Sequence, residues 1–399
     1  MLNQLNLGNN SASLLPMTNW PTKKLGEVAT IVGGSTPPTS NADNFMGNIP
    51  WFTPTELGFG EINYLSKSHR MISDGAATFT TVSGTNSVLL SSRAGIGKVG
   101  ILENPAAYNQ GIKAIDPDDN RLNCKFLAYW LIANKNLLEE RASGTTFLEL
   151  SRNSLMNLEI PLPPIEKQKR IVAKLEKLLG KVKEAKRLRA KAQAATASLL
   201  PATLHKIFSE GSDRGWQVKP FSEVVKIEAQ KNTKVLPYVG MEDIESGTGR
   251  FTGSKSAKRV KSNTSWFNTK HILYGKLRPY LNKFLMPDFE GHCSTELLPL
   301  LPDPRYLSRG WLATWLRQNN IVEKINATGA GSRMPRANMK LVAKFLIPLP
   351  SLAEQRKIVA HLDQLSEKIH QLQEYQKQTA ADLDALEKSI LHQAFSGGL

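Results

Sequence analysis

The stretch GIGKVG at residues 95–100 is the part of this sequence closest to a motif with chemistry of its own. Gly95, Gly97 and Gly100 have the spacing of a dinucleotide-binding loop, which would hold a pyrophosphate at the start of a helix. The flanking segments SVLLSSR and VGILENP have the apolar residues typical of strands, and Lys98 lacks the Ser or Thr that follows the lysine of a phosphate-binding loop. The pattern therefore predicts a glycine-rich β-hairpin and not a nucleotide site.

Other residues capable of catalysis or metal binding lack the partners that they would need. The segment ENPAAY at residues 103–108 is faintly similar to the Asn/Asp-Pro-Pro-aromatic motif of adenine methyltransferases, but the second proline and a cofactor glycine loop are missing. Cys124 and Cys293 have no second cysteine or spaced histidine nearby, so we expect both to be buried thiols in a reducing compartment. The seven histidines are scattered, which indicates no metal site.

The net charge of the chain is +16, from 51 Lys and Arg against 35 Asp and Glu. A protein this basic commonly works against a polyanion, because cations that neutralise phosphates release condensed counterions. Nucleic acid is favoured over a membrane surface, since no apolar run approaches the ~18 residues of a membrane span and no basic amphipathic anchor is present. The opening MLNQLNLGNNSAS lacks the charged start and apolar core of a signal peptide, and we expect a loose tail there.

The elements that would position any binding residues are written twice in the chain. At one constant offset, the phrase EIPLPPIEKQKRIV, which begins at Glu159, is matched by LIPLPSLAEQRKIV, which begins at Leu346. Two further blocks recur, LNCKFLAYWLIAN as LSRGWLATWLRQN and WPTKKLGEVATI as WQVKPFSEVVKI. Residues 32–121 and 228–306, between the matched blocks, share little that can be aligned. The repeat predicts one scaffold used twice with two different inserts, although drift after a duplication would leave a similar pattern.

After each proline-rich phrase the sequence turns polar, with apolar residues at alternating steps of four and three. This spacing is the seam of a coiled coil and predicts two helices of ~35 residues, each about 50 Å long. The first would begin near Glu166 and be ended or kinked by Pro201. Polar residues interrupt the seams at Arg189, Thr196, Gln376 and Thr379. The expected interface positions are Ile171, Leu175, Leu178 and Val182 in the first helix and Ile358, Leu362, Leu365, Ile369 and Leu372 in the second.

The two helices are expected to pair with each other, because a narrow apolar seam is not stable alone. Charge supports this pairing, since residues 166–191 carry eleven Lys and Arg against three acids and residues 353–388 carry five against seven. An antiparallel pair would relate the attached domains by a twofold axis and present them to DNA half-sites about one turn, roughly 34 Å, apart. Two independent helices, each lying on its own domain or on another subunit, are the alternative.

Together these features resemble the specificity subunit of a type I restriction–modification system, over essentially the whole chain from Trp20 to Leu399. The resemblance is carried by the two IPLP phrases and by LGEVATIVGGSTPPTS…GNIPWFTPTEL, SSRAGIGKVG and LYGKLRPYLNKF. It implies an α+β fold, with two mixed α/β target-recognition domains separated by two long helices packed as an antiparallel coiled coil, in a pseudo-twofold internal repeat. The expected boundaries are a flexible tail at 1–19, recognition domains at 20–158 and 213–345, and helical spacer regions at 159–212 and 346–399.

The resemblance also implies that the chain reads a bipartite, asymmetric DNA site, with one recognition domain per half-site and neither catalysis nor a cofactor of its own. Two methylation (M) subunits would dock on the helices and bring S-adenosylmethionine, and restriction (R) subunits would add translocation and cleavage driven by ATP and Mg. Such a complex belongs in the cytoplasm of bacteria or archaea, without a membrane. A stand-alone adenine methyltransferase and a coiled-coil protein adaptor are the competing functions.

DNA contacts are expected where cationic or amide side chains lie in loops between strands. In the first recognition domain these residues are Ser35, Thr36, Ser91, Arg93 and Lys98. In the second they are Lys276, Arg278, Tyr280, Asn282, Lys283, Arg333 and Arg336. Any one of them could instead be an ordinary surface residue. DNA, a partner subunit or solvent could face the basic run of the first helix, which includes Lys174, Lys177, Lys181, Lys183, Lys186, Arg187 and Arg189.

Overall fold

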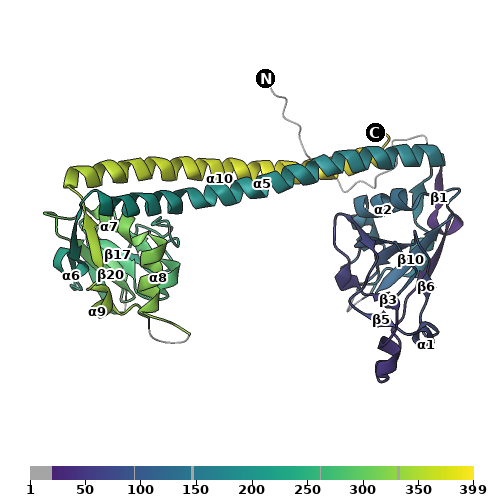
Figure 1. Ribbon diagram of the computed structural model, residues 1–399, viewed down its shortest axis with the longest axis horizontal. Coiled ribbons are helices and arrows are strands. Elements are labelled where there is room, and N and C mark those ends of the chain that lie inside the picture. The colour runs from purple at the N-terminus through teal and green to yellow at the C-terminus, as the bar shows by residue number, and fades with distance from the viewer. Residues whose placement is uncertain (1–19, 94, 145–147, 261, 330–332) are drawn as a thin grey trace. The chain divides into compact units, whose positions relative to one another are not determined.

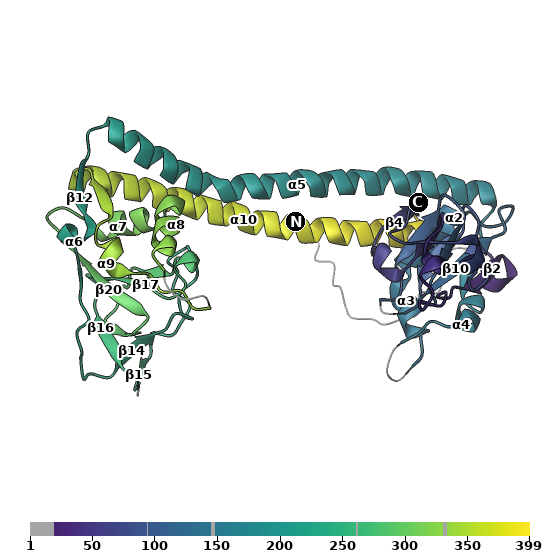
Figure 2. The ribbon, with the colours of Figure 1, turned by 60° about the horizontal axis from the view of Figure 1, so that its bottom comes forward.

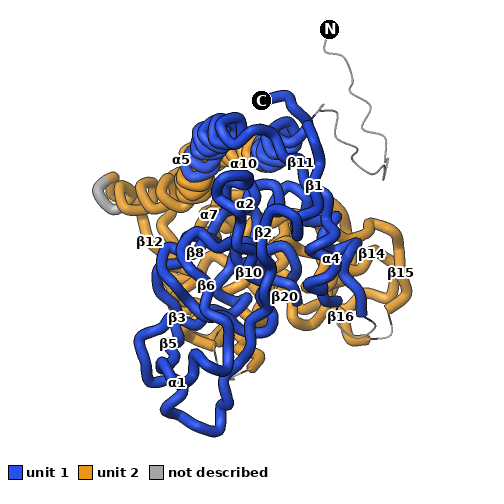
Figure 3. Tube along the Cα trace, turned by 90° about the vertical axis from the view of Figure 1, so that its right-hand side faces the viewer, with its two compact units in different colours: residues 1–188, 379–399 blue, residues 189–378 orange. Residues whose placement is uncertain are grey.

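The computed structural model in Figure 1 describes residues 20–399, apart from residues 94, 145–147, 261 and 330–332 and the side chains of 212 and 213. The chain divides into two compact units, residues 1–188 with 379–399 and residues 189–378, which Figure 3 colours separately. Each unit holds one globular head and parts of both long helices. We call residues 20–164 head 1 and residues 214–351 head 2. The tail expected at residues 1–19 lies outside the described residues.

The two long helices are α5, Ile165–Asp213, and α10, Leu352–Phe395. They have 49 and 44 residues, so both are longer than the seam spacing predicted. Pro201 lies inside α5, so the prediction that it would end the helix is wrong, while the alternative, a kink, stays a prediction. A proline removes the hydrogen bond to the carbonyl four residues earlier. Because that carbonyl belongs to the exposed residue Ala197, water can replace the missing donor.

The long helices pack against each other in opposite directions within each unit. In unit 1, Lys186 of α5 contacts Glu387 of α10 at 2.5 Å, and the first turns of α5 share a buried apolar cluster with the last turns of α10. In unit 2, Arg214 just after α5 lies 3.7 Å from Glu354 in the first turn of α10. The antiparallel pairing is therefore confirmed within each unit, with basic residues of α5 facing acids of α10.

The interruptions of the two seams meet in unit 2. Gln376 is buried and donates a 2.9 Å hydrogen bond to the Thr196 hydroxyl, and Arg189 donates to the main-chain carbonyl of Gln376. A buried polar contact in a coiled coil costs stability but fixes the register. Leu372 departs from its expected seam position and is 42% exposed, because Gln376 takes the buried place. The other expected seam residues are buried or half-buried, namely Ile171, Leu175, Leu178, Val182, Ile358, Leu362, Leu365 and Ile369.

The described residues of head 1 form three sheets and a few short helices. A two-stranded sheet pairs β1 (Thr22–Lys24) with β11 (Glu159–Pro161). A five-stranded sheet has the order β2 (Ala29–Gly33), β10 (Ile112–Pro117), β7 (Val88–Ser91), β8 (Val99–Leu102) and β4 (Ile62–Leu65). A four-stranded sheet has the order β5 (Met71–Ile72), β3 (Ile49–Phe52), β9 (Ala106–Tyr108) and β6 (Val82–Ser83). The helices are η1 (Leu25–Glu27), η2 (Ala42–Phe45), η3 (Pro54–Glu56), α1 (Asp74–Ala77), α2 (Cys124–Ala133), α3 (Lys135–Glu140) and α4 (Arg152–Met156).

Head 2 repeats this plan. Its two-stranded sheet pairs β12 (Gln217–Pro220) with β21 (Leu346–Leu349). One four-stranded sheet has the order β13 (Val225–Ile227), β20 (Leu297–Pro302), β17 (Ile272–Gly275) and β18 (Phe284–Leu285). The other, at the end of head 2 away from α7 in Figure 2, has the order β15 (Ala257–Lys258), β14 (Leu236–Val239), β19 (Gly291–Ser294) and β16 (Thr264–Phe267). The helices are α6 (Phe221–Val224), η4 (Pro279–Leu281), α7 (Arg309–Leu316), α8 (Asn319–Ala327) and α9 (Met339–Val342).

The two inserts, which could not be aligned in sequence, share one strand topology. In both heads an outer sheet contains one parallel pair, β3 with β9 and β14 with β19. In both heads an antiparallel hairpin, β7–β8 or β17–β18, holds a sequence motif in its turn, the glycine motif in head 1 and the cluster from Lys276 to Lys283 in head 2. The β-hairpin expected at residues 95–100 is thereby confirmed. Within the described residues, head 1 differs by the extra strand β4, which runs parallel to β8.

The repeated phrase carries a glutamine that joins each head to its long helix. Gln168 of α5 is fully buried and donates 2.8 Å hydrogen bonds to the carbonyls of Arg121 and Pro163. It also accepts a 2.8 Å bond from the N–H of Asn123, the residue that caps α2. Gln355 of α10 makes the equivalent bonds to Tyr306, Pro350 and Ser308. The phrase is written twice because the same joint is built twice.

Each head is also held by the end of the long helix that starts from the other head. Phe395 in the last turn of α10 packs edge-on against Phe126 of α2, with ring centroids 5.3 Å apart. Phe208 near the end of α5 takes the equivalent place against Trp311 of α7, at 5.0 Å. In both units, therefore, the start of one long helix and the end of the other complete the apolar core of the head.

Candidate nucleic-acid interface

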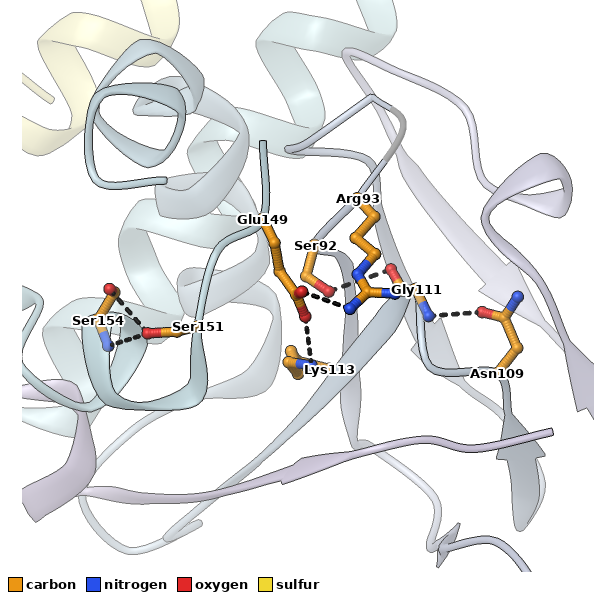
Figure 4. Close-up of polar contacts among 8 residues, drawn as sticks. All are labelled: Ser92, Arg93, Asn109, Gly111, Lys113, Glu149, Ser151 and Ser154. Atoms are coloured by element: carbon orange, nitrogen blue, oxygen red, sulfur yellow. Dashed lines mark hydrogen bonds and ion pairs between the residues drawn. The ribbon is translucent and has the colours of Figure 1, made fainter. Parts of the chain in front are cut away.

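The turn between β7 and β8 in head 1 is fixed by hydrogen bonds before any charge is considered (Figure 4). The hydroxyl of Ser92 donates to the Gly111 carbonyl at 3.2 Å, as Figure 4 shows. The N–H of Ser92 donates to the same carbonyl at 2.8 Å, and the Ser92 carbonyl accepts from the N–H of Leu150 at 3.0 Å. Ser91 is fully buried, and its hydroxyl donates to the Gly95 carbonyl at 2.6 Å. Ser91 therefore closes the turn, and its side chain is out of reach of DNA.

The cations of this turn are positioned by one carboxylate that the sequence analysis did not single out. Glu149 accepts hydrogen bonds from Arg93 and, at 3.4 Å, from Lys113, as Figure 4 shows. The bond from Arg93 lowers the pKa of Glu149 below its ordinary value. Arg93 keeps 47% of its side chain exposed, so it can still reach a ligand. Lys98 is half-buried and donates to the Pro54 carbonyl at 3.0 Å. Its main contact therefore joins the turn to the segment that begins at Pro54.

Ser35 and Thr36 lie in the loop after β2, and no described hydrogen bond joins them to the β7–β8 turn. The N–H of Ser35 donates to the Thr80 hydroxyl at 3.2 Å, and its own hydroxyl donates to the Phe79 carbonyl. Thr36 is exposed and donates to the amide oxygen of Gln110 at 2.5 Å. These bonds order the loop and leave the side chain of Thr36 exposed.

In head 2 the turn between β17 and β18 brings most of the expected residues together. Its backbone is left-handed at Arg278, with φ of 50°, and again at Asn282, with φ of 43°. The N–H of Arg278 donates to the Pro335 carbonyl at 2.7 Å, and the buried side chain of Asn282 donates to the Leu316 carbonyl at 2.9 Å. Lys283 donates to the Met241 carbonyl at 2.6 Å. The turn is thus attached to three other segments of the head.

Arg278 is the strained and unpaired cation of this turn. Among the described residues, the other non-glycine residues with positive φ are asparagines, Asn86 and Asn282, which tolerate that region far better than arginine. Strain of this kind is held in place by surrounding structure and is concentrated at functional sites. The Arg278 side chain is exposed, and no acid of the described part of the chain pairs with it. Tyr280, two residues on, exposes 52% of its surface.

Arg336 and Lys276 complete this cluster by their contacts with Glu296. Arg336 donates from two nitrogens to the Glu296 carboxylate, at 2.9 and 3.1 Å, and this bond raises the pKa of Arg336. The N–H of Lys276 donates to the Glu296 carbonyl at 2.9 Å, so Lys276, Arg278 and Arg336 occupy one small surface. Arg333 is exposed beside residues 330–332, which lie outside the described residues.

A second group of cations was missed by the sequence analysis. Lys255, Lys258 and Arg259 are exposed along β15, the edge strand of the outer sheet in head 2. In head 1, Lys67 and Arg70 precede β5, the corresponding edge strand. These cations could have been found from the sequence, because SKSHR at residues 66–70 is similar to SKSAKR at residues 254–259. The similarity was missed because the two inserts do not align as a whole.

The basic run of α5 is partly committed to contacts inside the protein. Lys186 contacts Asp384 and Glu387 at 2.6 and 2.5 Å, and these acids raise its pKa. Lys183 lies 2.8 Å from Glu61 of head 1. Arg187 is paired on the same helix with Glu184, at 2.7 and 2.8 Å. The remaining cations of the run are exposed, namely Lys174, Lys177 and Lys181.

The two cysteines differ in how deeply they are buried. Cys293 is buried, and burial raises its pKa to about 12, whereas Cys124 is only half-buried, with its pKa also raised by burial. No group of three or more His, Cys, Asp or Glu in the described ranges is arranged to hold a metal ion. None of the helices formed by the described residues is long and apolar enough to cross a membrane.

Comparison with known proteins places this arrangement among DNA-specificity proteins. The chain is 25% identical over 431 residues to the type I restriction enzyme EcoDI specificity subunit of Escherichia coli, across 98% of this chain and 90% of that relative. It is 27% identical over 294 residues to the MjaIX specificity subunit of Methanocaldococcus jannaschii, across 65% of this chain and 66% of that relative.

Solved structures share the fold. A chain from a structure of type I R-M complex assembly superposes with a TM-score of 0.75 at 23% identity, covering 95% of this chain and 98% of that chain. The HsdS subunit from Thermoanaerobacter tengcongensis gives 0.65 at 24% identity, covering 95% and 97%. The family described as "Type I restriction modification DNA specificity domain" matches twice, at residues 17–192 and 213–380. With both of its repeats matched, this chain belongs to the type I restriction–modification DNA specificity family.

Proposed function

We propose that this chain is the DNA-reading subunit of a type I restriction–modification complex, and that each head reads one half of a bipartite, asymmetric site. The observation that carries the proposal is the turn at Arg278. An exposed guanidinium without an acidic partner is held there on a left-handed backbone that three segments fix in place. Such a preorganised arginine suits the two acceptors that guanine presents in the major groove.

The reading surface of each head is the hairpin turn together with the loop before the proline-rich phrase. In head 1 the accessible residues of the expected set are Thr36, Arg93 and Lys98, with Ser35 supporting the loop and Lys113 beside Arg93. In head 2 they are Lys276, Arg278, Tyr280, Arg333 and Arg336, while Asn282 and Lys283 shape the turn. Exposed cations at β5 and β15 would contact phosphates, which supplies affinity without sequence information.

The chain itself carries out no catalysis under this proposal. The exposed polar faces of α5 and α10 are the docking surface for two methylation (M) subunits, which bind S-adenosylmethionine. Restriction (R) subunits join that assembly and use ATP and Mg to translocate and cut DNA. All of these reactions take place in the cytoplasm. No observation on the described residues favours a second function, such as a stand-alone methyltransferase or a protein adaptor.

The test is to produce the chain with its partner methylation subunit, methylate genomic DNA and locate the modified adenines by single-molecule sequencing. The expected result is one bipartite motif, with two unlike half-sites and a fixed gap. Replacing head 2 alone should change only one half of the motif. Modification without a recurrent motif would overturn the proposal, and so would a single uninterrupted motif that has no gap.

A simpler assay separates the two competing functions. The purified chain is incubated with S-adenosylmethionine and DNA, and methyl transfer is measured. We expect none without the partner subunit, so transfer by the chain alone would favour a methyltransferase. Nuclease protection of DNA at two separated footprints would exclude an adaptor that binds only proteins.

A further inference from the structure

Head 1 displays one phenylalanine in an unusual setting, on the loop between η3 and β4. Phe59 exposes 50% of its surface, while Leu57, two residues earlier, is buried. Gly58 and Gly60 flank the ring, and Gly60 has φ of 82°, a conformation that favours glycine. The strand that follows, β4, has no counterpart among the described residues of head 2. The display of Phe59 is therefore specific to head 1.

The loop that carries Phe59 is held from both sides. The side chain of Asn63 donates to the carbonyls of Gly58 and Glu61, each at 3.3 Å, and to the carbonyl of Val99 at 2.8 Å. On the other side, Lys98 fixes the Pro54 carbonyl at the start of η3. A large apolar side chain is thus presented to solvent on an ordered loop, and little conformational freedom is lost when it binds.

Two lysines and a glycine surround the ring. The ammonium groups of Lys98 and Lys135 lie 5.2 and 4.9 Å from its centroid. A Cβ atom at Gly95 would lie 3.2 Å from the ring, so the β7–β8 turn rests on its edge. Lys135 also lies 3.0 Å from Glu139. That ion pair is exposed, and exposed pairs contribute little to stability, so a DNA phosphate can take the place of Glu139 as the partner of Lys135.

Other exposed rings of head 1 lack this combination. Phe79 is 55% exposed, yet no cation of the described residues lies over it. Tyr64 is exposed beside Lys125, but the ammonium of Lys125 is bound to Glu176 at 2.8 Å. Only at Phe59, among the described rings of head 1, do an apolar surface, two cations and the proposed reading turn coincide.

We infer that Phe59 is a wedge that inserts against a base step of the half-site read by head 1, with Lys135 contacting the adjacent phosphate. Apolar side chains used in this way partly unstack a step, and the cost is offset by stacking of a base on the ring. Flanking cations neutralise phosphates on the deformed strand. This inference rests on the proposed function and adds how head 1 distinguishes its half-site, since steps differ in how easily they unstack.

The test uses the full chain with its methylation subunit and duplexes that carry 2-aminopurine at successive positions of the head 1 half-site. The fluorescence of this base analogue rises when its stacking is lost. We expect one position outside the methylated adenine to brighten in the complex. Phe59→Ala should abolish that signal and weaken binding about tenfold, whereas Phe59→Leu, an apolar wedge without a ring, should retain the signal and lose part of the affinity. Phe79→Ala is the matched control and should change neither.

A further variant tests the phosphate contact, because Lys135→Ala should lower the salt dependence of binding by about one ion. Phe59→Ala with an unchanged probe signal and unchanged affinity would overturn the wedge while both footprints persisted, so the proposed function would stand. If the unmodified chain protected no bipartite site at all, the proposed function itself would fail. A brightening at the methylated adenine alone would also count against Phe59, since methyltransferases extrude their target base.

Discussion

The turn that ends β7 in head 1 and the turn that ends β17 in head 2 have one backbone pattern. In each, a single residue donates its N–H to the carbonyl just before strand β10 or β20, and accepts at its own carbonyl from the loop before the proline-rich phrase. That residue is Ser92 in head 1 and Lys276 in head 2. Lys98 and Lys283 each tie the next strand to the loop after the first outer-sheet strand, at 3.0 and 2.6 Å.

The charged side chains at equivalent positions of this backbone differ between the two heads. Glu149 binds Arg93 in head 1, whereas Arg336 occupies the equivalent place in head 2 and binds Glu296. One extra arginine, Arg278, is then left without an acid in the described part of head 2. The comparison teaches that backbone hydrogen bonds preserve the reading turn while side chains on it change sign, so two heads of one plan can present different surfaces to DNA.

The largest effect is expected at the joint that both heads share. Gln168→Ala would leave two carbonyls and one N–H without partners in a buried site, and should lower the free energy of unfolding by about 3 kcal/mol. Gln355→Ala should lower it similarly, measured by urea unfolding followed by tryptophan fluorescence. Gln193→Ala, at an exposed position of α5, is the control. If the Gln168, Gln355 and Gln193 variants unfolded at the same urea concentration, the buried glutamines would not stabilise the two joints.

The next effect concerns the unpaired arginine of head 2. Arg278→Ala should weaken binding by about 1–3 kcal/mol and relax recognition in one half-site only. Arg93→Ala should cost less, because Arg93 is already engaged by Glu149. Binding to the full site and to sites altered in either half is measured at moderate salt, with Arg305→Ala, an arginine paired to Asp303, as control. Unchanged binding by the Arg278 variant would remove that residue from the interface.

A smaller effect should follow when the acids of the two turns are neutralised. Glu149→Gln and Glu296→Gln each release a cation, so the salt dependence of DNA binding should become steeper by about one ion. Titrations at several salt concentrations measure this slope. Glu323→Gln on α8, exposed and outside the turn, should leave it unchanged. If the salt dependence of DNA binding became steeper for only one variant, the ion pair would withhold a cation from DNA only in that head.

The smallest effect is the pH dependence of the Glu149 contact. Because its pKa is lowered in the folded protein, the contact stabilises head 1 fully above the ordinary carboxyl pKa and ceases to do so as pH falls through the lowered value. The pair is exposed, so its contribution should stay below about 1 kcal/mol. Urea midpoints of the unmodified chain and Glu149→Gln should therefore differ at neutral pH and converge in acid. A gap that persisted at low pH would assign the difference to something other than this charge.

The parts of the fold that could be predicted were those with period or repetition. The IPLP phrases located both joints, and the seam spacing located both long helices and their interruptions. The seam failed at Leu372 because a buried glutamine is invisible to a pattern built on apolar residues. The common plan of the inserts was missed because short strands such as β5 and β18 are specified by main-chain bonds, which leave few identical side chains. Arg278 was proposed as a contact residue from charge alone, and that assignment stays a prediction. The ion pairs of Glu149 and Glu296 become visible only when distant segments are brought together.

The contribution of α10 to unit 1 has a consequence for synthesis of the chain. Ile390, Leu391, Ala394 and Phe395 fill the apolar cluster of the head that is translated first. During synthesis, head 1 therefore leaves the ribosome before these four residues do. The apolar surface of α2 that they cover remains exposed to water until residues 390–395 have also emerged. Head 1 thus precedes head 2 in synthesis, but its core is completed only by residues that follow head 2.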